Sequence, residues 1–297
     1  MRLSGWMIPA AQVCLAVCSF AQAPTQTPQT PAPQQPAGQS TTPQTAGRAP
    51  VQPVAPREAI DDMLSISLYY WKPKLATPGY YGGRLSTDPT EQRLDFPDSP
   101  NHATGFVATL PTGGANHLEL GMFSVGDSGT FRPTTPLLIS GGTFPVGELL
   151  AMQYSIKNYR ITWNYLTFPV PAFGAKLRIK TLWEFQYNSI RPTIFFPEST
   201  IGAGPLANRY SVKWPGAGLG FEYVLSKRFR AEGRFTGMGF PHRSSYWDTD
   251  VSAVARFGSV EVYGGLKMYH FSTSPQKDVY FKSTFGGPLV GIRYVIH

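Results

Sequence analysis

The sequence predicts an all-β protein, a ten-stranded antiparallel up-and-down transmembrane β-barrel with short turns at one rim and long loops at the other. Three observations predict it. Apolar and polar side chains alternate from residue 62 onward, which is the pattern of strands. The clearest segment, 174–188, is far longer than the ~5–6 residues of an ordinary globular strand. Charged residues make up only 15% of the chain and aromatic residues 13%, and 30 residues are glycine.

Alternation marks out the strands one by one. In 174–188, Ile179 and Trp183 share one face, while Arg178 and Lys180 lie on the other. The segment 149–168 changes parity between Ile156 and Ile161, which predicts a β-bulge near Lys157. The predicted strands are 62–71, 103–110, 116–125, 149–168, 174–188, 217–225, 229–239, 247–257, 260–268 and 290–296.

The connections between these strands alternate in length. Four long ones, 72–102, 126–148, 190–209 and 272–287, and the brief 241–245 fall on one side. The short ones are 111–115, 169–173, 226–228 and 258–259. This alternation is typical of an up-and-down barrel in a membrane, with tight turns at one rim.

Aromatic side chains gather near the predicted strand ends, where the two interfaces of a bilayer would lie. This placement predicts that the apolar face points outward to lipid. The predicted aromatic belts contain Tyr69, Tyr70, Trp71, Trp183, Tyr187, Trp214, Trp247 and Tyr269 at the long-loop rim, and Phe168, Tyr223, Phe229, Phe257 and Tyr294 at the short-turn rim.

The polar face then lines the barrel interior. The predicted network of interior charges is Lys176, Arg178, Lys180, Glu184, Arg230, Glu232, Arg234, Asp248, Asp250, Arg256, Glu261, Lys267 and Arg293. A barrel of eight strands is just filled by side chains, so ten strands favour a narrow lumen plugged by ion pairs over a conducting pore. If the lumen were open, an excess of Lys and Arg would favour anions.

The first residues predict export. Arg2 precedes an apolar stretch that runs to Phe20, as in a secretory signal peptide of residues 1–21, with cleavage after Ala21. The segment Leu15-Ala16-Val17-Cys18 resembles a lipobox, although Val17 stands where Gly or Ala is expected. A lipoprotein anchored at Cys18 is therefore the alternative. Residues 22–57 are rich in Pro and Gln, which predicts a disordered periplasmic leader. Residues 58–297 are predicted to form the barrel. Cleavage would remove Cys14 and Cys18 and leave a chain without disulfides.

The chain resembles bacterial outer-membrane β-barrel proteins over residues ~60–297. Its last strand is similar to the assembly signal of that class at Gly291, Tyr294 and Ile296, while Leu289 and His297 depart from it. The resemblance implies an outer-membrane location, contact with outer-membrane lipid, insertion by the barrel-assembly machinery and loops that face outside the cell. No cofactor, metal site or nucleic-acid partner is expected, because histidines are unpaired in sequence and basic residues form no cluster.

Two tasks fit such a protein: surface binding or adhesion through the long loops, or passage of small solutes. Two further interpretations stay open. The ten-stranded barrels include the omptin proteases, and His242, Asp248 and Asp250 are expected at the same rim as Asp127, although the omptin spacing is not kept. A soluble, lipocalin-like carrier with its apolar face inside is the other alternative, since alternation alone does not fix which face is inside.

Overall fold

The computed structural model describes residues 64–73, 79–82, 92–95, 102–113, 116–134, 136–139, 142–170, 173, 176–197, 205–207, 209–240, 244–274 and 280–296. The predicted signal peptide and leader, together with His242 and His297, lie outside the described residues, as does the side chain of Phe168. No helix in the described part of the chain is long and apolar enough to cross a bilayer.

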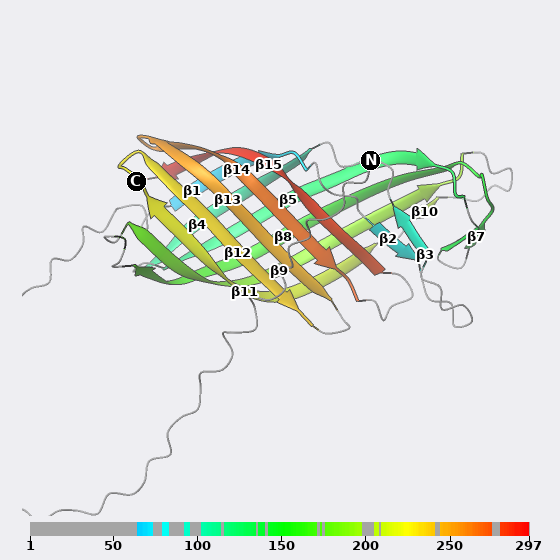
Figure 1. Cartoon of the computed structure of the whole chain (residues 1–297), viewed down its shortest axis with the longest axis horizontal. Helices are drawn as coiled ribbons and strands as arrows, with labels where there is room; N and C mark the ends of the chain where they lie inside the picture. The colour runs from blue at the N-terminus through cyan, green and yellow to red at the C-terminus, as the bar shows by residue number, and fades with distance from the viewer. Residues whose placement is uncertain are drawn as a thin grey trace, which may run out of the picture. The chain divides into compact units, whose positions relative to one another are not determined.

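Ten long antiparallel strands close into a barrel (Figure 1). Each long strand pairs with the next long strand along the chain. β1 also pairs with β15, from Leu64↔Ile296 to Trp71↔Leu289, which closes the cylinder. This closed barrel confirms the predicted fold class. The strands are β1 (Leu64–Trp71), β4 (Ala103–Gly113), β5 (Asn116–Phe131), β8 (Leu150–Pro169), β9 (Leu177–Phe195), β11 (Tyr210–Val224), β12 (Phe229–Gly239), β13 (Ser245–Phe257), β14 (Val260–Ser272) and β15 (Tyr280–Ile296).

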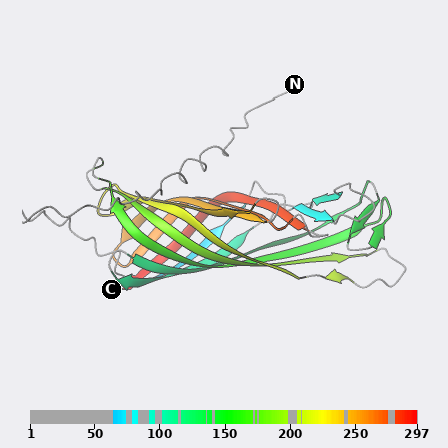
Figure 2. The ribbon, with the colours of Figure 1, turned by 90° about the horizontal axis from the view of Figure 1, so that it is seen from below.

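Five short strands lie at the long-loop end of the barrel (Figures 1 and 2). β2 (Gly79–Gly82) and β3 (Gln92–Asp95) extend the sheet beyond β15. β6 (Leu137–Ile139) and β7 (Gly142–Phe144) form a separate hairpin, and β10 (Leu206–Ala207) pairs with β9. Together with the ends of β5, β8 and β9, they make an extension at the loop side of the barrel.

Several strands run further into the loop side than the sequence predicts. The prediction of a loop from residue 126 was wrong, because β5 continues to Phe131 and pairs with β8 as far as Phe131↔Leu150. The segment Gly126–Gly129 has turn-type residues, but its neighbour β8 supplies the hydrogen bonds of a strand. Local composition is overridden here by tertiary pairing.

The bulge predicted near Lys157 was also wrong. β8 pairs with β5 and β9 without interruption through this region, and its register shifts between Tyr165 and Thr167. Met152 and Ile156 are buried on the same face as Arg160. The apparent change of parity arises because the barrel interior becomes apolar toward the loop side.

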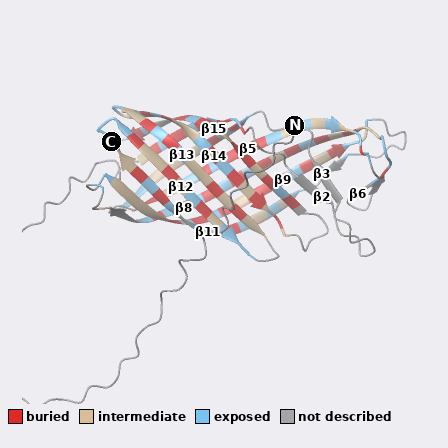
Figure 3. Cartoon of the chain, in the orientation of Figure 1, coloured by how far each residue is buried: buried red, intermediate tan, exposed pale blue. Residues whose placement is uncertain are grey.

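The outer wall is apolar. Leu68 and Leu266 are each 63% exposed and Trp183 is 57% exposed, whereas Ser67, Lys267 and Leu182 beside them are buried. Figure 3 shows buried and exposed residues alternating along the long strands. Burial alternates most clearly along β1 and β14, and the charged side chains of β12 to β14 lie on the inner face. Such an outer surface is stable against acyl chains and unstable against water.

Two adjacent glycines of β14 provide a matched test of how closely the strands approach. A Cβ at Gly265 would collide with the backbone of β13 at Val251 and Ser252, whereas at Gly264 the nearest atom, Leu289 O, is 3.7 Å away. We expect Gly265→Ala to lower the free energy of unfolding by about 1–3 kcal/mol, because backbone must move to accept the methyl group. Urea unfolding in detergent, followed by tryptophan fluorescence, measures it. Gly264→Ala should change the free energy little, and equal losses would contradict the close approach.

Candidate functional site: the barrel interior

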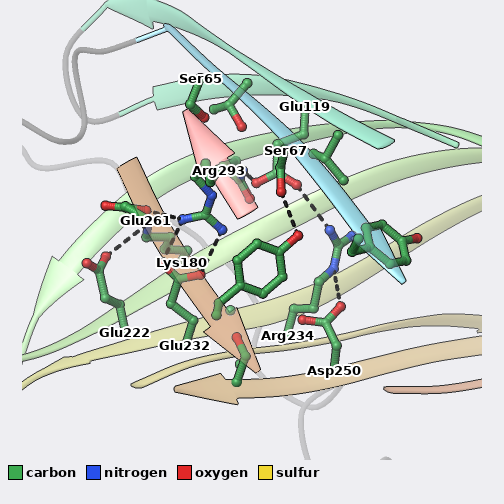
Figure 4. A pocket seen from close by; sticks show the side chains of 18 of the residues that line it. Ser65, Ser67, Glu119, Lys180, Glu222, Glu232, Arg234, Asp250, Glu261 and Arg293 are labelled. Atoms are coloured by element: carbon green, nitrogen blue, oxygen red, sulfur yellow. Dashed lines mark hydrogen bonds and ion pairs between the residues drawn. The ribbon is translucent and has the colours of Figure 1, made fainter. Parts of the chain in front are cut away.

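The short-turn half of the interior contains a network of ion pairs (Figure 4). Arg230 donates through Nη1 and Nη2 to the carboxylate of Glu261 at 2.7 and 2.6 Å, and through Nε to Glu232 at 2.6 Å. Arg293 donates to the same two carboxylates at 3.0–3.1 Å. Lys180 lies 3.2 Å from Glu222. The carboxylates of Glu232 and Glu261 therefore each join more than one strand of the barrel wall.

A second group of charges lies closer to the middle of the barrel. Asp248 accepts from Arg160 Nη1 at 2.8 Å and from Lys267 Nζ. Arg234 donates to Glu184 at 2.5 Å and to Glu119 at 3.0 Å. Thr162 and Gln186 add hydrogen bonds to Glu184. The ion pairs and hydrogen bonds of these buried carboxylates offset the cost of removing them from water.

The structure places most of the predicted interior charges in this network. Lys180, Glu184, Arg230, Glu232, Arg234, Asp248, Asp250, Glu261, Lys267 and Arg293 all take part. Arg178 has the interior parity and is half-buried. Arg256 also has the interior parity and is half-buried, and its Nε donates to Gly258 O within the turn. The prediction was wrong for Lys176 at the short-turn rim, which is exposed and precedes β9.

Sequence reasoning missed several members of the network, among them Arg160, Glu119, Glu222 and His117. His117 Nε2 lies 3.4 Å from Glu119. Glu222 alternates with Phe221, and Arg160 alternates with Ile161, so parity alone could have found both. Arg160 was obscured because Met152, Tyr154 and Ile156, which come earlier on its face, are apolar.

The charges in the network nearly balance. Its paired basic side chains number six (Arg160, Lys180, Arg230, Arg234, Lys267 and Arg293) and its acidic ones seven (Glu119, Glu184, Glu222, Glu232, Asp248, Asp250 and Glu261). The excess of cations expected in the lumen is not found among the described residues. An anion preference therefore has no support in the interior charge.

A layer of aromatic rings crosses the interior on the loop side of the charges. Trp71 lies edge-on to Phe123 with ring centroids 5.8 Å apart, and Phe123 contacts Tyr269 at 5.1 Å. The contacts continue through Phe271 to Trp214 at 6.3 Å. We call this layer the aromatic septum; its members are Trp71, Phe123, Trp214, Tyr246, Tyr269, Phe271 and Phe285.

Four residues of the predicted aromatic belts lie in the interior instead, and for these the prediction was wrong. Trp71 and Tyr269 are 0% exposed and Trp214 is 1% exposed, all three within the septum, and Tyr69 is also buried inside the barrel. Each stands at the parity of the interior, which the sequence signal of rings near strand ends does not reveal. The other described members of the predicted belts, Tyr70, Trp183, Tyr187, Tyr223, Phe229, Trp247, Phe257 and Tyr294, are exposed or half-buried.

A cavity of about 180 Å³ lies on the short-turn side of the septum, among the ion pairs. Hydroxyl groups of Ser67 and Tyr263, 2.5 Å apart, line one wall, and Glu232 and Arg293 line another. Lys267 Nζ stands between cavity and septum, 5.8 Å from the ring centroid of Trp71. The interior is therefore polar at one end and apolar at the other.

The arrangement expected for an omptin-like protease does not form among the described residues. Asp248 is buried in the ion pairs of the interior rather than at the rim, and Asp250 lies 3.8 Å from Arg234 Nε. Asp127 lies in β5, where its Oδ1 accepts from the Ser128 amide. Nor does any group of three or more His, Cys, Asp or Glu side chains in the described segments suit a metal ion.

An antiparallel cylinder with an apolar outer wall and enclosed, paired charges defines the class: the chain has the fold of outer-membrane β-barrel proteins. No protein-family model matches the chain, and no curated protein matches it.

Three similar solved structures are bacterial outer-membrane proteins. The protease OmpT of Escherichia coli has 11% identity and a TM-score of 0.49, covering 80% of this chain and 97% of OmpT. A major outer-membrane protein of Thermus thermophilus has 14% identity and a TM-score of 0.38, with coverages of 78% and 99%. Ail of Yersinia pestis has 8% identity and a TM-score of 0.29, with coverages of 79% and 98%.

Proposed function

We propose that the protein is a non-conducting outer-membrane barrel that works at its loop side, as a surface-binding or adhesion protein. The occluded interior carries this proposal. The aromatic septum and the ion-pair network occupy the lumen in series, which opposes passage of solutes. The extension made by β5, β8, β9 and the β6–β7 hairpin gives the loop side a folded surface for contacts.

Surface binding is tested by display on cells. Cells that express the full chain should attach to an epithelial cell layer at least several-fold more than cells with an empty vector. Replacing the connection 132–149, which contains β6 and β7, with a short Gly-Ser turn should remove most of that attachment. Variants of the septum serve as the control and should still attach. Attachment that survives loss of the hairpin and of every other loop would contradict a loop-side function.

Export through a cleaved signal peptide belongs to the same proposal, together with the leader of residues 22–57, contact with outer-membrane lipid and insertion by the barrel-assembly machinery. Arg2 and the following apolar run support it. We expect the mature protein from the outer-membrane fraction to begin at Gln22, as measured by intact mass. A mature chain that begins at lipid-modified Cys18 would establish the lipoprotein alternative instead.

A further inference from the structure

Three cations lie together on the outer wall of the barrel, at the loop-side edge of its apolar band. Lys157 of β8 faces outward because Ile156 and Asn158 on either side are buried in the interior. Arg191 of β9 faces outward for the same reason, between buried Ile190 and Pro192. Lys213 of β11 lies between partly buried Val212 and buried Trp214, which pack inside, and all three cations are exposed. We call Lys157, Arg191 and Lys213 the cationic patch.

The strand register brings these cations around one point. Lys157 stands opposite Ser189, and Ser189 stands opposite Ser211. Arg191 follows Ser189 by two residues, and Lys213 follows Ser211 by two, so each cation is within one step of Ser189 on the outer face. Directly opposed residues have Cβ atoms ~5 Å apart and diagonal ones ~7–8 Å, distances that long basic side chains cover easily.

The surroundings of the cationic patch are rich in hydroxyl groups and contain no acid. Ser124 stands opposite Lys157 on the β5 side, and Ser155 stands opposite Arg191. None of the described residues that face outward on β5, β8, β9 and β11 is acidic. Cations and hydroxyl donors without a competing carboxylate are the groups that bind phosphate oxygens.

An apolar hollow of about 370 Å³ opens on the outer wall next to this patch, toward the middle of the membrane. Leu120, Met122, Ile161 and Phe185 line it, and Tyr159 and Tyr187 border it on the loop side. Tyr187 is the register partner of Lys213, and Tyr159 follows Lys157 on β8 by two residues. The hollow and the cationic patch therefore form one continuous surface with a charged end and an apolar end.

We propose that this surface binds one anionic, phosphorylated lipid of the loop-side leaflet. Its phosphate lies on Lys157, Arg191 and Lys213, and part of an acyl chain fills the hollow beside Met122 and Ile161. The cationic patch lies on the loop side of the hollow, as lipid headgroups lie outside the hydrocarbon layer of a leaflet. Tyr159 and Tyr187 lie between the patch and the hollow, at the interface level where tyrosines are enriched. Basic groups at this level attract anionic headgroups.

Native mass spectrometry of the full-length protein in detergent tests the proposal, with phosphatidic acid as the probe and phosphatidylcholine of the same chains for comparison. We expect one phosphatidic acid to remain bound per barrel. In the triple variant Lys157→Gln, Arg191→Gln, Lys213→Gln, the fraction of barrels that retain phosphatidic acid should fall at least tenfold. Met122→Trp, which fills the hollow and keeps every charge, should also reduce it several-fold.

The matched control removes three other exposed cations, Lys72→Gln, Lys227→Gln and Lys282→Gln, and should retain the lipid. Equal loss in this control would show non-specific attraction and overturn the proposal. Release of the lipid by excess inorganic phosphate would show a site for free anions and overturn it as well, as would equal retention of phosphatidylcholine. Slower migration after boiling on a gel confirms that each variant is folded before it is compared.

Discussion

The triple variant Trp71→Ala, Phe123→Ala, Phe285→Ala is expected to turn a silent barrel into a conducting one. These rings contact one another across the interior, with centroids 5.8 and 6.4 Å apart, and the charges begin directly below them at Lys267. Their removal leaves space that water enters from the polar cavity. Planar-bilayer recording should show no steps for the natural protein and resolved current steps for the variant.

The outer wall offers a matched control for this experiment. Trp163→Ala, Trp183→Ala and Phe185→Ala remove three large rings that are exposed on the lipid side, and this variant should stay silent. Truncation of a fully buried aromatic residue costs about 3–5 kcal/mol, so the pair Trp71→Ala, Phe123→Ala is a milder alternative that keeps Phe285. A folded septum variant that remains silent, or a natural protein that conducts steadily, would contradict the septum as the barrier.

Asp248→Asn is expected to lower the free energy of unfolding by about 3 kcal/mol, because a completely buried ion pair loses one partner. The side chain of Asp248 is completely buried and accepts from both Arg160 and Lys267. The amide would remove the carboxylate that pairs with buried Arg160 and would leave Lys267 with only the more distant Asp250, 4.0 Å away. Urea unfolding of the protein in detergent micelles, followed by tryptophan fluorescence, gives the value.

Asp250→Asn is the control for that loss, since it removes the same charge two residues away on the same face. The side chain of Asp250 is 23% exposed and lies 3.8 Å from Arg234 and 4.0 Å from Lys267. Its removal should cost less than about 1 kcal/mol, as for solvent-screened pairs. If the two variants lose equal stability, the pairing of Asp248 is not what stabilises the network.

The fold could be predicted from the sequence because a membrane barrel repeats one simple rule. Ile179, Trp183 and Phe221 point outward, and Arg178 and Arg234 point inward, as the alternation requires. The number of strands follows from counting such segments. Strand ends were less accessible: residues 126–131 lack an apolar alternation, and only their pairing with β8 makes them a strand.

The composition of the interior was only half predictable. Charged residues on the polar face, such as Arg230 and Glu261, lie in the interior as expected. The interior positions of Trp71, Trp214 and Met152 could not be predicted in this way. In the sequence, an apolar residue at the interior parity looks the same as a lipid-facing residue beside a bulge. The distinction depends on which residues meet across the lumen, and those residues lie far apart along the chain.

The long separation of these partners has a consequence for how the protein reaches its native state. Arg160 and Asp248 are 88 positions apart, and Arg234 and Glu119 are 115 apart. A partly assembled sheet would therefore hold ionised groups without counter-ions next to hydrocarbon. Intermediates of this kind are unfavourable in a bilayer, so we expect insertion to be cooperative, with β1 and β15 joining as the event that satisfies the interior.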